Sequence, residues 1–336
     1  MTILVTGGTG YIGSHTVVQL LESNEDVVIL DNLSNSSIKV LSRIEAITHK
    51  QPDFIEGDVR DSNLLEFIFK KHPISSVIHF AGLKSVAECG VKPLLYYDNN
   101  VNGSLVLIKN MEKAGIRSLV FSSSATVYGE PVFLPYTEDH PLKPINVYGQ
   151  TKLMVEHILR DLSLSDSSWR IALLRYFNPV GAHFSGLIGE DPLGIPNNLM
   201  PFITQVAVGK REKLMVYGND YETIDGTGVR DYIHVDDLAS GHLAALTYLE
   251  KNQGVITVNL GTGKGTSVLE LVRSFENACG KTISIEITGR RNGDLPEYFA
   301  VADHAQNLLG WKAQHNIHRI CADSWRWQIQ NPNGFY

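Results

Sequence analysis

The feature that most constrains this chain is its opening, where three glycines separate a short apolar run from a helical pattern. Residues 3–5 are β-branched or apolar, which is typical of a buried strand. Gly7, Gly10 and Gly13 follow at regular spacing, and apolar positions then recur with helical periodicity over 17–21. Glycine adopts the backbone angles of a tight turn at low cost. The opening therefore predicts a strand, a bare turn and a helix.

A turn of this kind suits a diphosphate group. The bare backbone permits close approach, and the start of a helix offers unpaired amides and the positive end of its dipole. A second strand-like run, residues 27–30, ends at Asp31, eighteen residues after Gly13. A carboxylate there accepts hydrogen bonds from the adenosine ribose hydroxyls and repels a 2′-phosphate. The spacing predicts a dinucleotide site and favours NAD over NADP.

Strand-like runs alternate with amphipathic segments through the first half of the chain. The further strands are expected at residues 54–58, 77–82, 119–122 and 171–175, and the helices between them at 38–48, 64–71, 105–114 and 155–162. This alternation predicts an α/β fold with a doubly wound parallel (Rossmann) sheet and helices on both faces. Ligands bind such a sheet at the carboxyl ends of its strands.

The second half has a different character. Residues 181–201 hold several Gly, Pro and Asn residues with little periodicity, and a loop of that length is usually functional or disordered. Helical patterns return at 202–208, 236–249 and 268–278, with strand-like pieces at 214–217, 255–260 and 283–287. We expect a dinucleotide-binding domain over 1–178 and a smaller mixed α/β domain over 179–336.

Composition excludes several classes of partner. The net charge is −7 and the basic residues form no long run, which argues against nucleic acid. No apolar run has the length of a membrane span, and no signal peptide precedes the first strand, so no membrane association is expected. Cys89, Cys279 and Cys321 show no paired spacing. We expect free thiols, no metal site and a reducing cytoplasm.

Tyr148 and Lys152 form a candidate catalytic pair. Residues four apart share a helix face, with β-carbons about 5–6 Å apart. A neighbouring ammonium lowers the pKa of a tyrosine, ordinarily about 10, by about 1–3 pH units, and the positive nicotinamide ring of NAD adds to this effect. The phenolate can then take a proton from a substrate hydroxyl while hydride leaves the same carbon. Ser124, at the end of the fifth strand, can relay that proton or polarise the reacting oxygen.

Longer motifs point to one family. They are Phe-Ala-Gly-Leu-Lys at 80–84, Tyr-Tyr-Asp-Asn-Asn at 96–100, Ser-Ser-Ser-Ala-Thr-Val-Tyr-Gly at 122–129, Leu-Arg-Tyr-Phe-Asn-Pro at 174–179, Gly-Ile-Pro-Asn-Asn-Leu at 194–199 and Gly-Thr-Gly-Val-Arg-Asp-Tyr at 226–232. With the glycine turn and the Tyr/Lys/Ser set, they make the chain resemble the extended short-chain dehydrogenase/reductase superfamily and, within it, the UDP-glucose 4-epimerases. The resemblance spans nearly the whole chain.

The resemblance implies an isomerase of galactose metabolism that holds NAD tightly and interconverts UDP-galactose and UDP-glucose through a 4-keto sugar. The sugar turns over between removal and return of hydride, so UDP is expected to be held firmly and the sugar loosely. Residues 1–178 would bind NAD and 179–336 the UDP-sugar. Members of the family are commonly homodimers.

The resemblance also implies a role for individual residues. Tyr148 is the base and later the acid at the C4 hydroxyl, Lys152 tunes it and holds the nicotinamide ribose, and Ser124 hydrogen-bonds the C4 oxygen. The NAD site would comprise Gly7, Gly10, Tyr11, Ile12, Gly13, Asp31, Asn32, Leu33, Ser34, Asn35, Ser36, Asp58, Val59, Phe80, Ala81, Gly82, Leu83, Lys84, Asn99 and Phe177 with Ser124, Tyr148 and Lys152. The UDP-sugar site would comprise Lys84, Ser124, Tyr148, Asn178, Asn198, Leu199, Met215, Val216, Tyr217, Arg230, Arg291, Asp294 and Tyr298.

Physical chemistry bears on two of these roles independently. Arg supplies the planar, bidentate donors that a diphosphate favours, so Arg230 and Arg291 suit a clamp, although each could also be a solvated surface residue. Asn178 follows a strand at the predicted cleft, where it could equally form a turn. Asp236 and Asp237 resemble a catalytic carboxylate pair, but we expect them in the first turn of a helix.

Two alternatives compete with epimerisation. A nucleotide-sugar 4,6-dehydratase needs an acid and a base after the active-site hydroxyl, where this chain has Ala125 and Thr126. A UDP-sugar decarboxylase or a simple dehydrogenase is similarly disfavoured. A non-catalytic NAD-binding regulator would be expected to lack Tyr148 or Lys152, and both are present. In this family a bulky residue at the place of Tyr298 goes with poor use of N-acetylated sugars.

Overall fold

A seven-stranded parallel sheet forms the centre of the molecule. The computed structural model describes residues 1–196, 198–291 and 293–335; Asn197, part of the motif at 194–199, lies outside these ranges. The strand order is β11-β6-β5-β4-β1-β2-β3. The bounds are β1 Thr2–Thr6, β2 Asp26–Asp31, β3 Asp53–Glu56, β4 Ile74–His79, β5 Ser118–Ser124, β6 Arg170–Tyr176 and β11 Gly254–Leu260. The predicted α/β class with a doubly wound sheet is confirmed.

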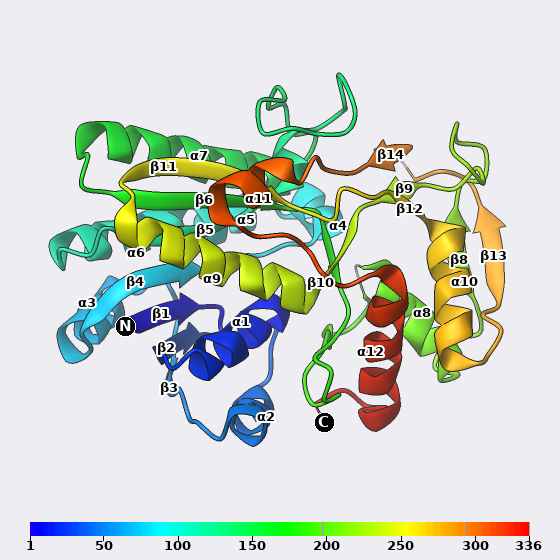
Figure 1. Ribbon diagram of the computed structural model, residues 1–336, viewed down its shortest axis with the longest axis horizontal. Helices are drawn as coiled ribbons and strands as arrows, with labels where there is room; N and C mark the ends of the chain where they lie inside the picture. Colours follow the sequence, from blue (N-terminus) through cyan, green and yellow to red (C-terminus); the bar gives the residue numbers. More distant parts are fainter. Residues whose placement is uncertain (197, 292, 336) are drawn as a thin grey trace.

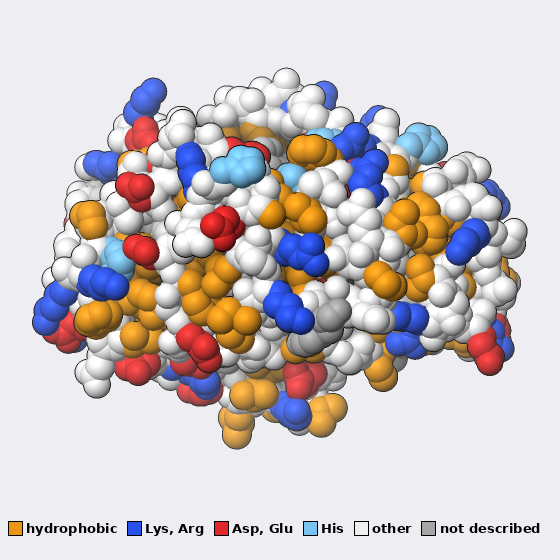
Figure 2. Space-filling view, turned by 90° about the horizontal axis from the view of Figure 1, so that it is seen from below, with side chains coloured by type: hydrophobic (Ala, Val, Ile, Leu, Met, Phe, Trp, Pro, Cys, Tyr) orange, Lys and Arg blue, Asp and Glu red, His pale blue; other side chains and the backbone are white. Residues whose placement is uncertain are grey.

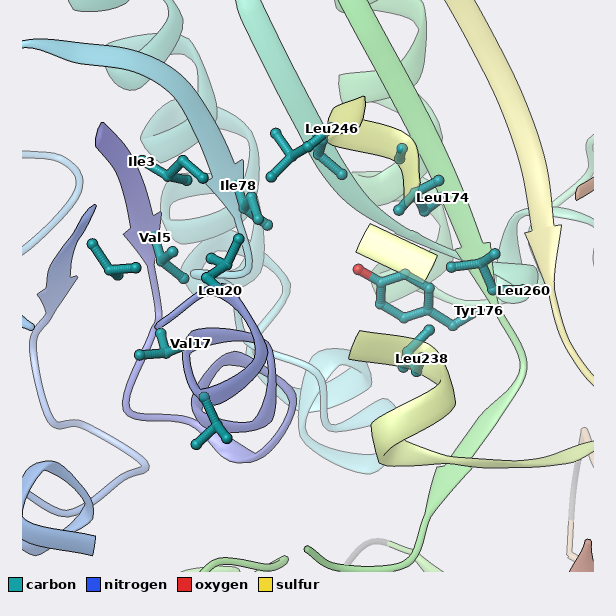
Figure 3. Packing of buried hydrophobic residues seen from close by; sticks show 14 of the residues in the cluster. Ile3, Val5, Val17, Leu20, Ile78, Leu174, Tyr176, Leu238, Leu246 and Leu260 are labelled. Carbon is teal, nitrogen blue, oxygen red and sulfur yellow. The ribbon is translucent and has the colours of Figure 1, made fainter. Parts of the chain in front are cut away.

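Helices cover both faces of this sheet (Figure 1). Those on one face are α1 Tyr11–Glu22, α2 Lys39–Thr48 and α9 Val235–Lys251, and those on the other are α3 Ser62–Lys71, α6 Gly103–Lys113 and α7 Val147–Ser165. Figure 3 shows Val17 and Leu20 of α1 beside Ile3 and Val5 of β1. Each such side chain stabilises the fold by about 1.5–3 kcal/mol when it leaves water.

One strand of the large sheet comes from the second half of the chain. β11 pairs with β6 in parallel from Gly254 beside Arg170 to Leu260 beside Tyr176. On the sequence alone, residues 255–260 are expected in the smaller unit. An apolar run predicts a strand, but it does not reveal with which other strands that strand pairs. The preceding helix, α9, packs against α1. We keep the division after residue 178 as a proposal, with the addition that the chain returns to the first unit for α9 and β11.

A smaller unit stands beside the carboxyl ends of the strands (Figure 1). Its helices are α8 Leu199–Ala207, α10 Val268–Cys279 and α12 Ile317–Gln330, with the paired strands β8 Leu214–Tyr217 and β13 Ile285–Thr288. Its core joins Ile203, Leu271, Phe275 and Ile320. Asp236 and Asp237 lie in the first turn of α9, as expected.

Short elements connect the two units and complete the fold. They are β7 Asn178–Val180 paired with β10 Tyr232–His234, β9 Val229–Arg230 between β12 Thr266–Ser267 and β14 Glu297–Tyr298, α4 Val86–Val91, α5 Pro93–Tyr96, the π-helix η1 Tyr97–Asn102, the 3₁₀ turn η2 Ala125–Val127 and α11 Asp303–Leu309. Sequence reasoning predicted none of these short elements, nor α12.

The surface of the molecule mixes charge types. On the face drawn in Figure 2, Lys and Arg are interspersed with Asp, Glu and apolar side chains. Within the described ranges, no helix combines the length and the apolar character needed to cross a membrane.

Candidate active site

The glycine turn packs too closely to admit side chains at two of its positions. Gly7 has a φ of 71°, and a β-carbon there would lie 2.8 Å from the Ala81 amide nitrogen. A β-carbon on Gly13 would lie 2.2 Å from the Gly7 carbonyl oxygen. Gly10 is the N-cap of α1 and supplies no side chain to occupy the first amides of the helix. The turn thus presents backbone donors and space to an anion.

Asp31 is held at the end of β2 by a ring of donors. Its carboxylate accepts hydrogen bonds from the Thr9 amide at 3.1 Å, the Leu33 amide at 2.9 Å and the Ser36 hydroxyl at 3.1 Å. Three donors fix the orientation of this carboxylate, which lines the cavity described below and has lone pairs left to accept from a ligand. Nearby, the Arg60 guanidinium holds the pKa of the Asp58 carboxyl well below its usual range.

These features line one cavity of about 790 Å³ at the carboxyl ends of the strands. Its wall includes every residue predicted to bind NAD except Leu33. Leu33 instead donates a hydrogen bond from its amide to the Asp31 carboxylate. The bare turn, the open helix start and the ribose-facing carboxylate suit the diphosphate and adenosine of a dinucleotide. The residues present therefore fit NAD.

Tyr148 and Lys152 enter this cavity from the first turns of α7. The Asn146 side chain caps the helix by accepting from the Gly149 amide at 2.8 Å, so the helix begins beside the strand ends. The Lys152 ammonium donates to the Ser122 carbonyl at 2.6 Å and lies 5.8 Å from the centroid of the Tyr148 ring. The predicted shared helix face is thus observed.

The electrostatics of the pair differ from the expectation. Burial raises the pKa of Tyr148 to about 12, and a hydrogen bond with Ser124 acts in the opposite direction. Burial also lowers the pKa of Lys152 to about 8, against the attraction of the Glu156 carboxylate. The spacing predicted a lowered pKa for Tyr148, which is wrong, because desolvation by burial raises this pKa by more than the hydrogen bond with Ser124 lowers it.

Ser124 is fixed by a residue that sequence reasoning did not assign. Its hydroxyl oxygen accepts from the Thr126 amide at 3.2 Å and from the Thr126 hydroxyl at 2.9 Å. Both residues line the cavity close to Tyr148. The short Ser-x-Thr spacing could have suggested this contact, since such hydroxyls commonly bond the backbone two residues on.

A second cavity of about 150 Å³ adjoins the first. Asn178, Pro179 and Asn198 line both. The other predicted UDP-sugar residues that line the smaller one are Leu199, Met215, Val216, Tyr217, Arg230, Arg291 and Asp294. Lys84, Ser124 and Tyr148 lie on the wall of the larger cavity instead.

Neighbouring groups of the protein orient the two arginines of the smaller cavity. The Arg230 guanidinium donates to the carbonyls of Val229 at 2.8 Å and Leu295 at 2.9 Å. Arg291 lies with its guanidinium carbon 4.5 Å from the centroid of the Tyr217 ring, and its Nε donates to Asp294 at 2.9 Å. Two preoriented guanidinium groups can bind both phosphates of a diphosphate.

Tyr298 lines neither of these two cavities. Its ring lies 5.3 Å from Phe177 and 5.0 Å from Tyr136, centroid to centroid. Its buried hydroxyl has no hydrogen-bond partner among the described residues. Tyr298 therefore stands behind the cavity wall rather than on it.

Two further residues organise the site and were not predicted. Asn100 accepts from the Leu83 amide at 2.8 Å and donates to the Leu83 carbonyl at 3.0 Å, which fixes the loop at 80–84. Glu190 accepts from Asn198 at 2.6 Å and lies 3.4 Å from the Lys84 ammonium. The contacts of Asn100 with Leu83 and of Glu190 with Lys84 join separate elements, so local spacing gives no signal for them.

A known family accounts for this arrangement. The model of the NAD dependent epimerase/dehydratase family matches residues 3–261. The chain belongs to this family. UDP-glucose 4-epimerase from Yersinia pestis is 56% identical over 336 residues, covering 100% of this chain and 99% of that protein. The enzyme of the same name from Bacillus subtilis is 56% identical over 335 residues, again covering 100% and 99%.

Solved structures of the epimerase/dehydratase family agree. UDP-glucose 4-epimerase from Bifidobacterium longum, in complex with NAD⁺ and UDP, superposes with a TM-score of 0.96 at 52% identity, covering 99% of this chain and 100% of that one. The Stenotrophomonas maltophila enzyme, with bound NAD and formylated UDP-arabinopyranose, gives 0.97 at 49% identity, covering 99% of each chain. The resemblance to the UDP-glucose 4-epimerases is confirmed.

Proposed function

We propose that this chain is an isomerase that interconverts UDP-galactose and UDP-glucose at C4, with NAD bound throughout, in galactose metabolism. The observation that carries the proposal is full-length identity of 56% to UDP-glucose 4-epimerases. In the structure, Tyr148, Lys152 and Ser124 line the same cavity as the glycine turn and Asp31. The residues that would act on a sugar hydroxyl therefore lie in the same cavity as those that would bind the dinucleotide.

Each residue of the catalytic set has a distinct task in this proposal. NAD, when bound, supplies an electrophilic ring that takes an electron pair from C4 and returns it, and its positive charge favours the phenolate of Tyr148. Tyr148 accepts the proton of the C4 hydroxyl when hydride leaves C4, and gives that proton back to the C4 oxygen when hydride returns to the opposite face of the carbon. Lys152, anchored on the Ser122 carbonyl, places a second positive charge beside that phenolate. Ser124 hydrogen-bonds the C4 oxygen.

The two ends of the substrate are treated differently. Arg230 and Arg291 are fixed by neighbouring groups and suit the diphosphate. Asn178 and Asn198 stand where the two cavities meet, which is where the sugar would lie. Firm anchoring of UDP with loose contact to the sugar permits the 4-keto sugar to turn over before it is reduced on its other face.

Product analysis after incubation with UDP-galactose tests the proposal. The protein as isolated, with no added nicotinamide cofactor, is expected to convert UDP-galactose to UDP-glucose until the two nucleotide sugars reach equilibrium. A strict need for stoichiometric external NAD, or release of a keto or dehydrated sugar as the product, would contradict it. The second outcome would favour a dehydratase, although Ala125 and Thr126 offer no acid–base pair for loss of water.

The Tyr148→Phe variant separates catalysis from binding. It is expected to retain NAD, because the ring still fills its place, and to lose turnover with the phenol group. An active Tyr148→Phe enzyme would remove Tyr148 from its assigned role. A wild-type protein that binds NAD but converts no nucleotide sugar would support the non-catalytic regulator.

A homodimer in the cytoplasm completes the proposal. Val91 and Leu94, at the ends of α4 and α5, are 80% and 81% exposed, and Met154 of the adjoining α7 is 41% exposed. An apolar patch of this kind is typical of an interface between copies. Light scattering is expected to give twice the chain mass for wild type and a monomer for Leu94→Glu; a monomeric wild type would refute the dimer. The free thiols of Cys89, Cys279 and Cys321 suit a reducing compartment.

A further inference from the structure

Thr126 has no assigned role in the chemistry, yet it contacts the active-site hydroxyl twice. It lies in the single 3₁₀ turn that follows β5, and its amide and its hydroxyl both point at the oxygen of Ser124. Its own carbonyl packs against α7, where a β-carbon on Gly149 would lie 2.7 Å from it. Thr126 is therefore fixed to Ser124 on one side and to the turn that holds Tyr148 on the other.

The two contacts settle the direction of the Ser124 hydroxyl. A serine hydroxyl has one proton to donate and two lone pairs to accept with. The Thr126 amide can only donate, and the Thr126 hydroxyl donates at 2.9 Å. With both lone pairs occupied, Ser124 has only its proton left for the cavity, where Tyr148 stands.

We propose that Thr126 is a positioning residue that holds Ser124 as a hydrogen-bond donor toward the reacting oxygens. The inference rests on the proposed C4 chemistry and deepens it, because it distinguishes the two roles open to Ser124. A hydroxyl whose lone pairs are occupied cannot accept the C4 proton and pass it on. Ser124 therefore has one proton to donate, to the Tyr148 phenolate or to the C4 oxygen according to which of them carries the negative charge, and the transferred proton moves directly between the C4 oxygen and Tyr148.

A conservative series at Thr126 tests this role in the NAD-loaded enzyme. Thr126→Val keeps the shape and the backbone amide but removes the hydroxyl donor, so kcat is expected to fall about fivefold with KM nearly unchanged. Thr126→Ser restores the hydroxyl and is expected to restore kcat. Loss of donation to the phenolate makes Tyr148 harder to ionise, so the rising limb of the pH–kcat profile should move to higher pH in Thr126→Val. Thr126→Ala serves as a second variant should valine disturb folding.

A double-mutant cycle excludes a purely structural role. If Thr126 acts through Ser124, Thr126→Val has no further effect in a Ser124→Ala background. Effects that multiply, an unshifted pH profile, or wild-type kcat in Thr126→Val would each overturn the inference. A wild-type enzyme without epimerase activity would refute the proposed function instead. The phenolate absorbance of Tyr148, taken as the difference between each protein and its Tyr148→Phe counterpart, still tests the Thr126 contact in that case.

Discussion

The Gly13→Ala substitution adds one methyl group and is expected to strain the glycine turn, although alanine favours the helix that follows it. The β-carbon of Gly13→Ala would lie 2.2 Å from the Gly7 carbonyl oxygen and 2.8 Å from the Gly8 α-carbon. Both neighbours are backbone atoms, so no side chain can rotate away. Ordinary contact begins at 3.4 Å, and the turn must therefore retreat by roughly 1 Å.

The magnitude follows from two opposing effects. Alanine favours a helix over glycine by about 1 kcal/mol, whereas overpacking of this kind costs about 1–3 kcal/mol. Gly90 offers a matched control, because it lies within α4 and a β-carbon there meets nothing within 4 Å. Both variants gain helix propensity, so Gly13→Ala is expected to unfold with about 1–3 kcal/mol less free energy than Gly90→Ala.

Urea unfolding and retention of NAD through gel filtration measure the two consequences. Displacement of the turn removes the backbone amides from a diphosphate, so Gly13→Ala should lose its cofactor while Gly90→Ala keeps it. Full NAD retention by Gly13→Ala, together with stability equal to that of Gly90→Ala, would refute the reasoning that the turn is closed to side chains.

Four further predictions test other parts of the structure, and three of them have a control variant. In wild type the buried Arg175 guanidinium lies 2.6 Å from the Glu156 carboxylate. Glu156→Gln removes that negative charge and should lower the free energy of unfolding by about 3–5 kcal/mol. Glu66→Gln, which removes a carboxylate of an exposed ion pair, should not change the urea midpoint. Burial raises the pKa of Asp236 to about 7, with Asp323 and Asp237 adding to the shift. The folded chain thus holds this proton more tightly than the unfolded chain, so the free energy of unfolding declines as pH rises from about 4 to about 7. The melting temperature of Asp236→Asn should therefore exceed that of wild type by an amount that grows between about pH 5 and about pH 8. Arg291→Gln should raise KM for UDP-galactose about tenfold without loss of NAD, while Arg290→Gln, whose Nε is engaged by Asp220, should leave KM unchanged. Wild type should use UDP-N-acetylglucosamine poorly. Tyr298→Gly should improve that use, and Tyr298→Phe, which removes only a hydroxyl that has no partner among the described residues, should not.

Local sequence pattern was sufficient for most of the large sheet. Buried strands such as residues 3–5 and 171–174 are continuous apolar runs, and the helices between them show clear periodicity. β11 shows where such reasoning stops, since 255–260 reads as a strand in any sheet and only its pairing with β6 places it. Two-residue strands such as β9 and β14 are defined by their partners and have no period to detect.

The candidate site shows the same division. Gly7, Asp31 and Lys152 stand at spacings that follow from a strand, a turn or a helix, so their convergence on one cavity could be expected. Glu190 contacts Lys84, which is remote in the chain, so the position of Glu190 in the site could not be predicted. The pKa of Tyr148 was mispredicted because spacing reveals a neighbouring charge, whereas desolvation depends on everything packed around the ring.

The junction between the two cavities constrains which part of the substrate can move. β7, which contains Asn178, continues directly from the sheet strand β6 and pairs with β10, two residues beyond Arg230. The Asn178 amide donates to the Asp231 carbonyl at 2.9 Å, so the strand that holds the arginine and the strand end near Tyr148 are joined by short hydrogen-bonded segments. If the diphosphate binds at Arg230, we expect it to keep a nearly constant distance from Tyr148 throughout the reaction. We then expect inversion at C4 to come from rotation of the sugar about its link to the diphosphate, and not from movement of the nucleotide or of one unit against the other.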